Sequence, residues 1–164
     1  DLKKIKIAYF GGGPGPEIFG TIKFILSNRS NIEKIEIVLL DKYASSWEYS
    51  HTILLNHLIP EINDRAIANS FEAINLDFTE REHLNENQTK FENANFVVFQ
   101  NCINEIPQPK VINAVANIIE ISSALNNSAA FLISDLTGGS QFVRNIVNSI
   151  QNGISQSKRK VKIR

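Results

Sequence analysis

The chain has 164 residues, of which 43% are hydrophobic and 21% are charged, and its formal net charge is zero. This length fits one domain with a sizeable buried core. The zero net charge excludes a protein that an overall electrostatic field draws to nucleic acid or to anionic lipid, and no apolar run approaches the roughly 20 residues of a membrane-spanning helix.

The single cysteine, Cys102, cannot form an internal disulfide, and His51, His57 and His83 lack the spacing of metal ligands. We therefore expect no metal site, helix-surface roles for the histidines, and a cytoplasmic protein. The chain contains no methionine, even at position 1, so we expect it to be part of a longer polypeptide.

The first apolar run, residues 5–10, predicts a buried strand that ends in a glycine cluster at residues 11–15. A helix is expected next, because Pro16 suits the first helical position and Glu17 complements the positive end of the helix dipole. The polar residues 28–31 end it. Its apolar residues fall on one face, namely Ile18, Phe19, Ile22, Ile25 and Leu26.

A second strand is predicted at residues 35–40, followed directly by Asp41. Ser45 and Glu48 have the spacing of a capping box at the start of the next helix, which Pro60 should end. The residues predicted to form its buried face are Trp47, Leu54, Leu55 and Leu58. A third strand is expected at 71–76, before Asp77.

The polar stretch at residues 79–93 is expected to be a surface helix or loop, and residues 96–99 a fourth strand. Pro107 and Pro109 precede a helix, and residues 129–133 predict a fifth strand. The inward residues of that helix are expected to be Val111, Ile112, Val115, Ile118, Ile119 and Leu125.

A last helix is expected after Gly138–Gly139, with a turn at 155–157 and a sixth strand starting at 160–164. Its inward residues are Phe142, Val143, Ile146, Val147 and Ile150, and Gly153 should end it. Strand and helix thus alternate five times. This predicts one α/β domain over residues 1–164, a three-layer αβα sandwich with a mostly parallel sheet. Ligands of such sheets bind at the carboxyl ends of the strands, near the switch in strand order.

Gly11, Gly13 and Gly15 form a GxGxG segment between a strand and a helix. Glycine allows a sharp turn and a close approach of the backbone to a ligand, so the loop and the helix N-terminus suit a carboxylate or a phosphate. A dinucleotide-binding loop has a further glycine where this chain has Pro16, and no P-loop lysine follows. The alternative is a glycine-rich turn that binds nothing.

Asp41 follows the second strand, where a carboxylate accepts hydrogen bonds from a ribose diol in folds of this kind. The alternative is a strand-end acid or a helix cap. The segments IAYFGGGPGPEIFG and IEIVLLDKY together resemble the first two motifs of class I S-adenosylmethionine-dependent methyltransferases. This resemblance implies a Rossmann-like methyltransferase fold with S-adenosylmethionine as the cofactor.

By this resemblance, Gly11, Gly13 and Gly15 line the methionine and ribose part of the cofactor, and Asp41 binds the ribose hydroxyls. It also implies that Asp77 lies near the adenine amine, and that Gln100 and Asn101, which end the fourth strand, face the transferable methyl group.

The sequence departs from the family in two places. The acid that the family has two residues before the first glycine is Tyr9 here, so one cofactor contact is missing or replaced. The hairpin that completes the family's sheet is also missing, which predicts a fragment or a truncated domain.

Methyl transfer from a sulfonium needs the acceptor and the methyl group held in line, and a catalytic base is optional. Asn101 is the candidate catalytic residue, since its amide suits a hydrogen bond to an acceptor amine or hydroxyl. The alternative is a side chain that caps the strand end. Trp47 either flanks the adenine or belongs to the core, and Cys102 is expected to be a small buried residue.

The loop at residues 134–140 lies on the same predicted rim, where it shapes the acceptor side or caps a helix. The basic residues within 158–164 either contact nucleic acid or form a charged edge. The leading hypothesis is a methyltransferase that acts on a small molecule, a protein or RNA. The alternatives are a methyltransferase-like module without activity and a nicotinamide-dependent oxidoreductase.

Overall fold

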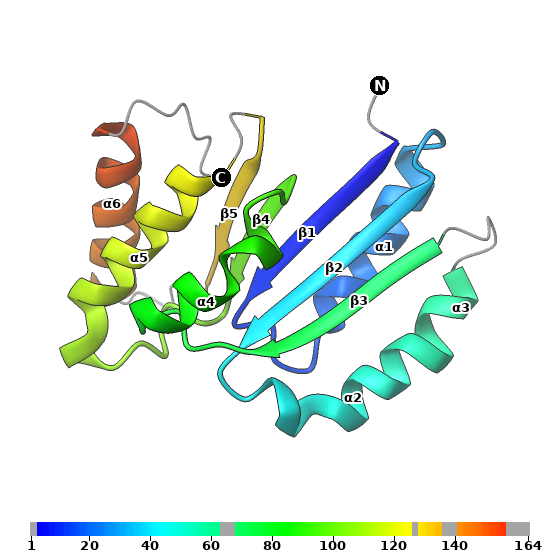
Figure 1. Cartoon of the computed structure of the whole chain (residues 1–164), viewed down its shortest axis with the longest axis horizontal. Coiled ribbons are helices and arrows are strands. Elements are labelled where there is room, and N and C mark those ends of the chain that lie inside the picture. Colours follow the sequence, from blue (N-terminus) through cyan, green and yellow to red (C-terminus); the bar gives the residue numbers. More distant parts are fainter. Residues whose placement is uncertain (1–2, 63–67, 126–127, 136–140, 157–164) are drawn as a thin grey trace.

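The computed structural model describes residues 3–62, 68–125, 128–135 and 141–156. Its five strands form one sheet in the order β3-β2-β1-β4-β5, and every neighbouring pair is parallel (Figure 1). The strands are β1 Lys4–Phe10, β2 Lys34–Asp41, β3 Ala68–Asn75, β4 Phe96–Gln100 and β5 Ala130–Ser134. The predicted α/β class and the parallel sheet are confirmed.

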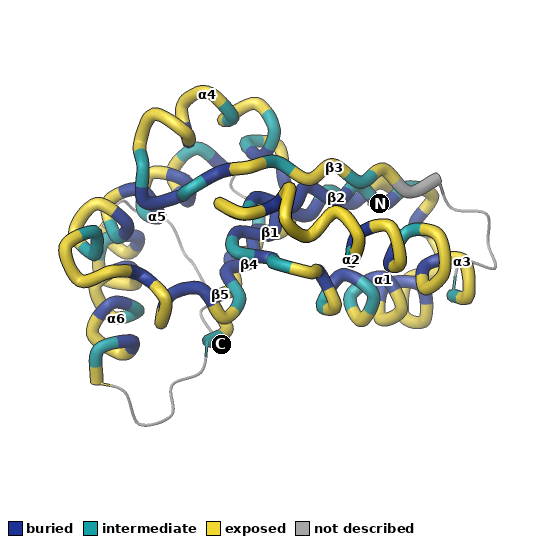
Figure 2. The backbone as a smooth tube through the Cα atoms, turned by 90° about the horizontal axis from the view of Figure 1, so that it is seen from below, coloured by how far each residue is buried: buried dark blue, intermediate teal, exposed yellow. Residues whose placement is uncertain are grey.

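Helices cover both faces of this sheet. α1 and α3 lie on one side of it and α4 on the other (Figure 2). The helical segments are α1 Pro16–Asn28, the 3₁₀ turn η1 Ala44–Trp47, α2 Glu48–Ile53, the π-helical turn η2 Leu54–Leu58, α3 Ile59–Ile62, α4 Arg81–Phe91, the 3₁₀ turn η3 Gln108–Lys110, α5 Val111–Ala124 and α6 Gln141–Gln156.

The central strands are apolar on both faces, because each face meets a layer of helices. In β1, Ile7 and Tyr9 pack in the core beneath α1, α2 and α3, whereas Ala8 and Phe10 pack in the core beneath α4, α5 and α6. Phe10 stacks on Phe99 of β4, with ring centroids 4.7 Å apart. Side chains that alternate along one strand therefore belong to two separate cores.

The strand order reverses between β1 and β4. The chain runs outward from β1 to β2 and β3, and then returns to add β4 and β5 on the other side of β1. The connections after β1 and β4 therefore leave the sheet in opposite directions, which opens a crevice at the carboxyl ends of these two strands.

The predicted capping box after β2 is wrong. Neither η1 nor α2 has a side-chain cap, and the backbone N–H of Ser45 donates instead to Asn75 Oδ1 at 3.0 Å. The neighbouring strand β3 therefore satisfies a backbone donor in the first turn of this helical segment.

The predicted buried face of this helix is correct at Leu54, which is buried, and at Leu55, which is partly buried against the same core. Trp47 is 37% exposed and Leu58 42% exposed. Trp47 ends the 3₁₀ turn η1 and Leu58 ends the π-helical turn η2, so neither residue keeps the 3.6-residue period on which the prediction depends. Pro60 does not end the helix, which continues to Ile62 after that turn.

Other boundaries also differ from those predicted. β3 begins at Ala68 rather than at residue 71. The polar stretch after it, predicted to be a surface helix or loop, is helix α4, which buries Leu84 and Phe91. Ile112 is 82% exposed, since α5 buries the opposite face.

Helix α6 continues past Gly153, where a Cβ atom would lie 2.2 Å from Ile119 Cδ1. This glycine therefore brings α6 close to α5 instead of ending it. The expected loop at Gly138–Gly139, the sixth strand at 160–164 and the basic residues within 158–164 lie outside the described residues.

Candidate functional site

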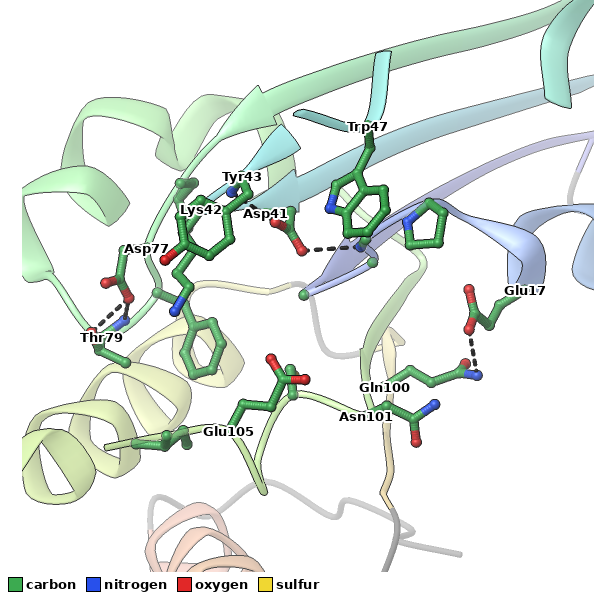
Figure 3. A pocket seen from close by; sticks show the side chains of 18 of the residues that line it. Glu17, Asp41, Lys42, Tyr43, Trp47, Asp77, Thr79, Gln100, Asn101 and Glu105 are labelled. Atoms are coloured by element: carbon green, nitrogen blue, oxygen red, sulfur yellow. Dashed lines mark hydrogen bonds between the residues drawn. The ribbon is translucent and has the colours of Figure 1, made fainter. Parts of the chain in front are cut away.

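A cavity of about 380 Å³ lies at the carboxyl ends of the strands. This is within the range of about 300–1,000 Å³ typical of small-molecule sites. Its walls come from the glycine segment, the ends of β2 and β4, and the segments that follow β3 and β4 (Figure 3). All of the predicted site residues except Gly15 line this cavity. They are Gly11, Gly13, Asp41, Asp77, Gln100 and Asn101.

Asp41 is bonded directly to the glycine segment. Its Oδ2 accepts a hydrogen bond from the backbone N–H of Gly13 at 3.0 Å, and its Oδ1 accepts one from the N–H of Tyr43 at 2.8 Å. An ionised carboxylate has about four lone-pair sites, so both oxygens retain capacity for a further donor. The predicted pair of the glycine segment and Asp41 is thus brought together in the structure.

The three glycines have different roles, although all have positive φ angles, of 68°, 48° and 79°. At Gly11 a Cβ atom would lie 2.3 Å from Cys102 Cβ, and at Gly15 it would lie 3.1 Å from Ile18 Cδ1. At Gly13 it would meet only Trp47, at 3.9 Å. Gly11 and Gly15 therefore allow close packing, and Gly13 leaves space in the cavity. Gly15, the N-cap of α1, does not line the cavity.

His51 does not line the cavity but supports its glycine segment, a role that the sequence did not reveal. Its predicted surface position is wrong, because it is only 4% exposed and its ring packs edge-on against Phe71. Its Nε2 lies 2.9 Å from the carbonyl oxygen of Gly13. The carbonyl is an acceptor, so this nitrogen donates. Gly13 is therefore held from both sides, by Asp41 at its N–H and by His51 at its carbonyl.

Asp77 lines the opposite side of the cavity, with both carboxylate oxygens in use. Oδ1 accepts hydrogen bonds from the N–H and the hydroxyl of Thr79 at 2.9 and 2.6 Å, and Oδ2 accepts one from Lys110 Nζ at 3.1 Å. Burial raises the pKa of Asp77, but the hydrogen bonds from Thr79 and Lys110 outweigh this effect and leave the pKa below its usual value.

This lowered pKa predicts an acid-dependent loss of stability. The folded state binds fewer protons at Asp77 than the unfolded state, so the contribution is present above the unfolded pKa of about 3.9 and is lost as the pH falls through the folded value. We expect the melting temperature to decrease as the pH is lowered below about 4. This decrease should be less steep in Asp77→Asn, which lacks the titrating carboxyl group. Melting curves by circular dichroism between acid and neutral pH measure this. An exposed control, Glu61→Gln, should follow the wild-type profile.

The end of β4 contributes two amide side chains to the rim. Gln100 Nε2 donates to Glu17 Oε1 at 3.0 Å. Asn101 is the only non-glycine residue in the described part of the chain with a positive φ, of 52°, and its backbone N–H donates to Ser134 O at 2.9 Å. Unusual backbone angles of this kind cluster at functional sites. The Asn101 side chain is exposed at the mouth of the cavity (Figure 3).

The segment after Asn101 is fixed from β5. Asp135 Oδ2 accepts hydrogen bonds from the N–H groups of Ile103 and Asn104 at 2.7 and 3.2 Å, while its buried Oδ1 has no partner among the residues that the structure describes. Cys102 is buried as predicted, and burial raises the pKa of its thiol well above the usual range.

Aromatic side chains form one wall of the cavity. The indole of Trp47 lies beside Gly13, and Tyr43 follows Asp41 with Lys42 Nζ 4.7 Å from its ring centre. Trp47 is therefore a site residue rather than a core residue. The sequence offered it as an alternative, but its helical spacing favoured the core.

The ionisable residues on the walls are mostly acidic. Four carboxylates and two lysines line the cavity, which gives a formal charge of −2. One of these lysines, Lys110, is already paired with Asp77 and with Glu80, the latter at 2.6 Å. The cavity thus suits a ligand with positive charge better than a strongly anionic one.

The described residues contain no group of three or more histidine, cysteine or acidic side chains able to hold a metal ion. Within the same residues, no helix combines the length and the apolar character needed to cross a lipid bilayer.

No protein-family model matches the sequence, and no curated protein matches it. Among solved structures, malate dehydrogenase from Naegleria fowleri has a TM-score of 0.47 and 11% identity, over 98% of this chain and 47% of that one. Cypemycin decarboxylase CypD has a TM-score of 0.49 and 9% identity, over 99% and 82% of the two chains.

A third structure, reported for the conversion of a disulfide bond into a thioacetal group during echinomycin biosynthesis, has a TM-score of 0.41 and 12% identity, over 77% and 42% of the two chains. The chain therefore spans less than half the length of the first and third of these proteins.

Proposed function

We propose that this cavity binds S-adenosylmethionine and that the chain is the cofactor-binding domain of a methyltransferase. The main support is the hydrogen bond between Gly13 and Asp41. It places a strand-end carboxylate against a tight glycine turn, at the edge of an open cavity. A nucleoside ligand in this position would have its ribose at Asp41 and its 5′ substituent along the glycine turn.

The order of polar groups around the cavity fits the three parts of the cofactor. In Figure 3, Asp77 lies on one side, Asp41 in the middle, and Glu17 with Gln100 on the other side. This order matches an adenine near Asp77, a ribose at Asp41 and an amino-acid end near Glu17 and Gln100. The indole of Trp47 closes the cavity beside the expected ribose.

The charge of the cavity separates this proposal from a nicotinamide-dependent oxidoreductase. A dinucleotide has a doubly anionic pyrophosphate that normally lies against the glycine loop and the helix N-terminus. Here Pro16 offers no N–H at that point, and the Glu17 carboxylate in the first turn of α1 lines the same wall. A cofactor with a sulfonium and an ammonium group is attracted by such a wall, whereas a pyrophosphate is repelled.

Bound S-adenosylmethionine would supply an activated methyl group. The chain would then need to hold an acceptor in line with it. Asn101 is proposed to do so, because its side chain lies at the mouth of the cavity, directly after β4. The acceptor is proposed to be a small molecule, a protein or RNA, in a cytoplasmic protein whose one cysteine is a buried free thiol.

Calorimetric titration tests the cofactor. We expect S-adenosylmethionine and S-adenosylhomocysteine to bind with dissociation constants in the micromolar range, and NAD to give no binding heat. Binding of NAD in place of both adenosyl ligands would overturn the proposal in favour of an oxidoreductase. Absence of binding by all three would overturn the assignment of the cavity.

A binding module without activity remains the second candidate, because Tyr9 stands where the family has an acid. Transfer of radioactive methyl groups to components of a cell lysate by the full-length protein separates the two. Incorporation that depends on Asn101 supports the enzyme, while tight binding without incorporation supports the module.

A further inference from the structure

We infer that Glu17 supplies the carboxylate that receives the α-ammonium group of the adenosyl ligand, in place of the acid missing at position 9. This inference rests on the proposed function. The side chain at position 9, where this chain departs most clearly from the family pattern, does not line the cavity.

Tyr9 belongs to the core on the other side of β1. It is 2% exposed and packs beneath α1. Its hydroxyl donates to Thr21 Oγ1 at 2.7 Å, and the Thr21 hydroxyl donates in turn to the backbone carbonyl of Glu17 at 2.8 Å. Burial raises the pKa of Tyr9 to about 12, so it stays a neutral phenol. It cannot provide a charge to a ligand.

Glu17 lies on the cavity wall next to the glycine segment, in the first turn of α1. Gln100 donates to its Oε1 at 3.0 Å, which directs the carboxylate towards the end of β4 (Figure 3). Among the described residues nothing donates to Oε2, and no lysine or arginine pairs with this carboxylate. It is thus a carboxylate fixed by one neutral donor and available to a cation.

The position of this carboxylate fits the expected pose. With the ribose at Asp41, the 5′ substituent runs along the glycine turn, away from Asp77. Glu17 and Gln100 are the polar side chains that end this path, on the side opposite Asp77 (Figure 3). The lysines that line the cavity, Lys42 and Lys110, belong to other segments. This end of the cavity therefore favours the ammonium over the carboxylate of an amino-acid group.

A purely structural role for Glu17 is the competing explanation, since an acid in the first helical turn stabilises a helix. Such a role would affect every ligand equally. The two ligands that discriminate are S-adenosylhomocysteine, which contains the amino-acid group, and 5′-methylthioadenosine, which lacks it. The measured quantity is the ratio of their two dissociation constants.

In calorimetric titrations of Glu17→Gln, we expect S-adenosylhomocysteine to bind about 10- to 100-fold more weakly, as for a lost charged hydrogen bond, and 5′-methylthioadenosine to bind within about twofold of wild type. The matched control Glu105→Gln removes a carboxylate from another wall of the same cavity and should leave the ratio unchanged. Equal weakening of both ligands, or no change, would overturn the role of Glu17.

The wild-type chain gives a second test that does not depend on the variant folding. An analogue of S-adenosylhomocysteine without the α-amino group should bind at least about tenfold more weakly than the parent, as expected for loss of a charge-assisted contact. An analogue without the α-carboxylate should lose less affinity than the analogue without the α-amino group. The reverse order would contradict the inference. If wild type binds the nucleosides but shows no preference among them, only the role of Glu17 fails; if it binds none, the proposed function fails with it.

Discussion

Asp41→Ala is expected to abolish binding of S-adenosylhomocysteine, with a loss of at least about 100-fold in affinity. Two effects combine. The variant removes the proposed partner of the ribose hydroxyls, and hydrogen bonds to charged groups contribute about 1.5–3 kcal/mol each. It also leaves the N–H groups of Gly13 and Tyr43 without the acceptor that holds them 3.0 and 2.8 Å away, so the glycine turn loses its fixed shape.

The measurement is calorimetric titration of the variant beside wild type. Glu33→Gln is the control, because this exposed carboxylate pairs with Lys3, at the other end of the sheet. It should bind as wild type does. Far-ultraviolet circular dichroism confirms that the Asp41 variant is folded. Unchanged affinity in a folded Asp41→Ala protein would show that the ribose is not at this residue.

Gly11→Ala is expected to destabilise the fold by about 2–5 kcal/mol. A left-handed backbone costs a residue with a side chain about 1–2 kcal/mol, and forcing an extra group into a packed core costs about 1–3 kcal/mol. Both apply, because Gly11 has a φ of 68° and its new Cβ would lie 2.3 Å from Cys102 Cβ. Neither Cβ atom is at the flexible end of a long side chain. The segments that follow β1 and β4 must therefore move apart.

Gly13→Ala is the matched comparison. It has a φ of 48°, but its Cβ would meet only the indole of Trp47, at 3.9 Å, so it should lose only the backbone part, about 1–2 kcal/mol. Urea unfolding gives both values. For ligand affinity the order should be reversed. Gly13→Ala should weaken binding more than Gly11→Ala, relative to the stability that each variant loses, since the new methyl group at position 13 occupies the cavity. Equal destabilisation by the two variants would contradict the packing role of Gly11.

Much of the fold follows from local patterns in the sequence. Continuous apolar runs such as residues 35–40 predicted buried strands, and Pro16 with Glu17 predicted the start of α1. The meeting of Gly13 and Asp41 was also predictable, because parallel strands bring their carboxyl ends to one edge. These inferences need only periodicity and the direction of the strands.

The errors concern residues whose environment is set by distant parts of the chain. Trp47 and Leu58 are exposed because they end a 3₁₀ turn and a π-helical turn, which change the period of the helix, and nothing local in the sequence marks these turns. His51 is buried because it packs on Phe71 of β3 and bonds to Gly13. Glu17 was recognised only as a helix-dipole residue, since its partner Gln100 is 83 positions away.

The glycine turn packs against both hydrophobic cores, which lie on opposite faces of the sheet. Gly11 rests on Cys102, in the core beneath α4, α5 and α6, while Gly15 rests on Ile18 and Leu54, in the core beneath α1, α2 and α3. A ligand bound at this turn would contact a segment that packs on both cores, so binding should stabilise both helix layers against thermal unfolding. A compound at 100 times its dissociation constant adds about 2.7 kcal/mol to stability, and a simple melting screen of metabolites would therefore reveal what this protein accommodates.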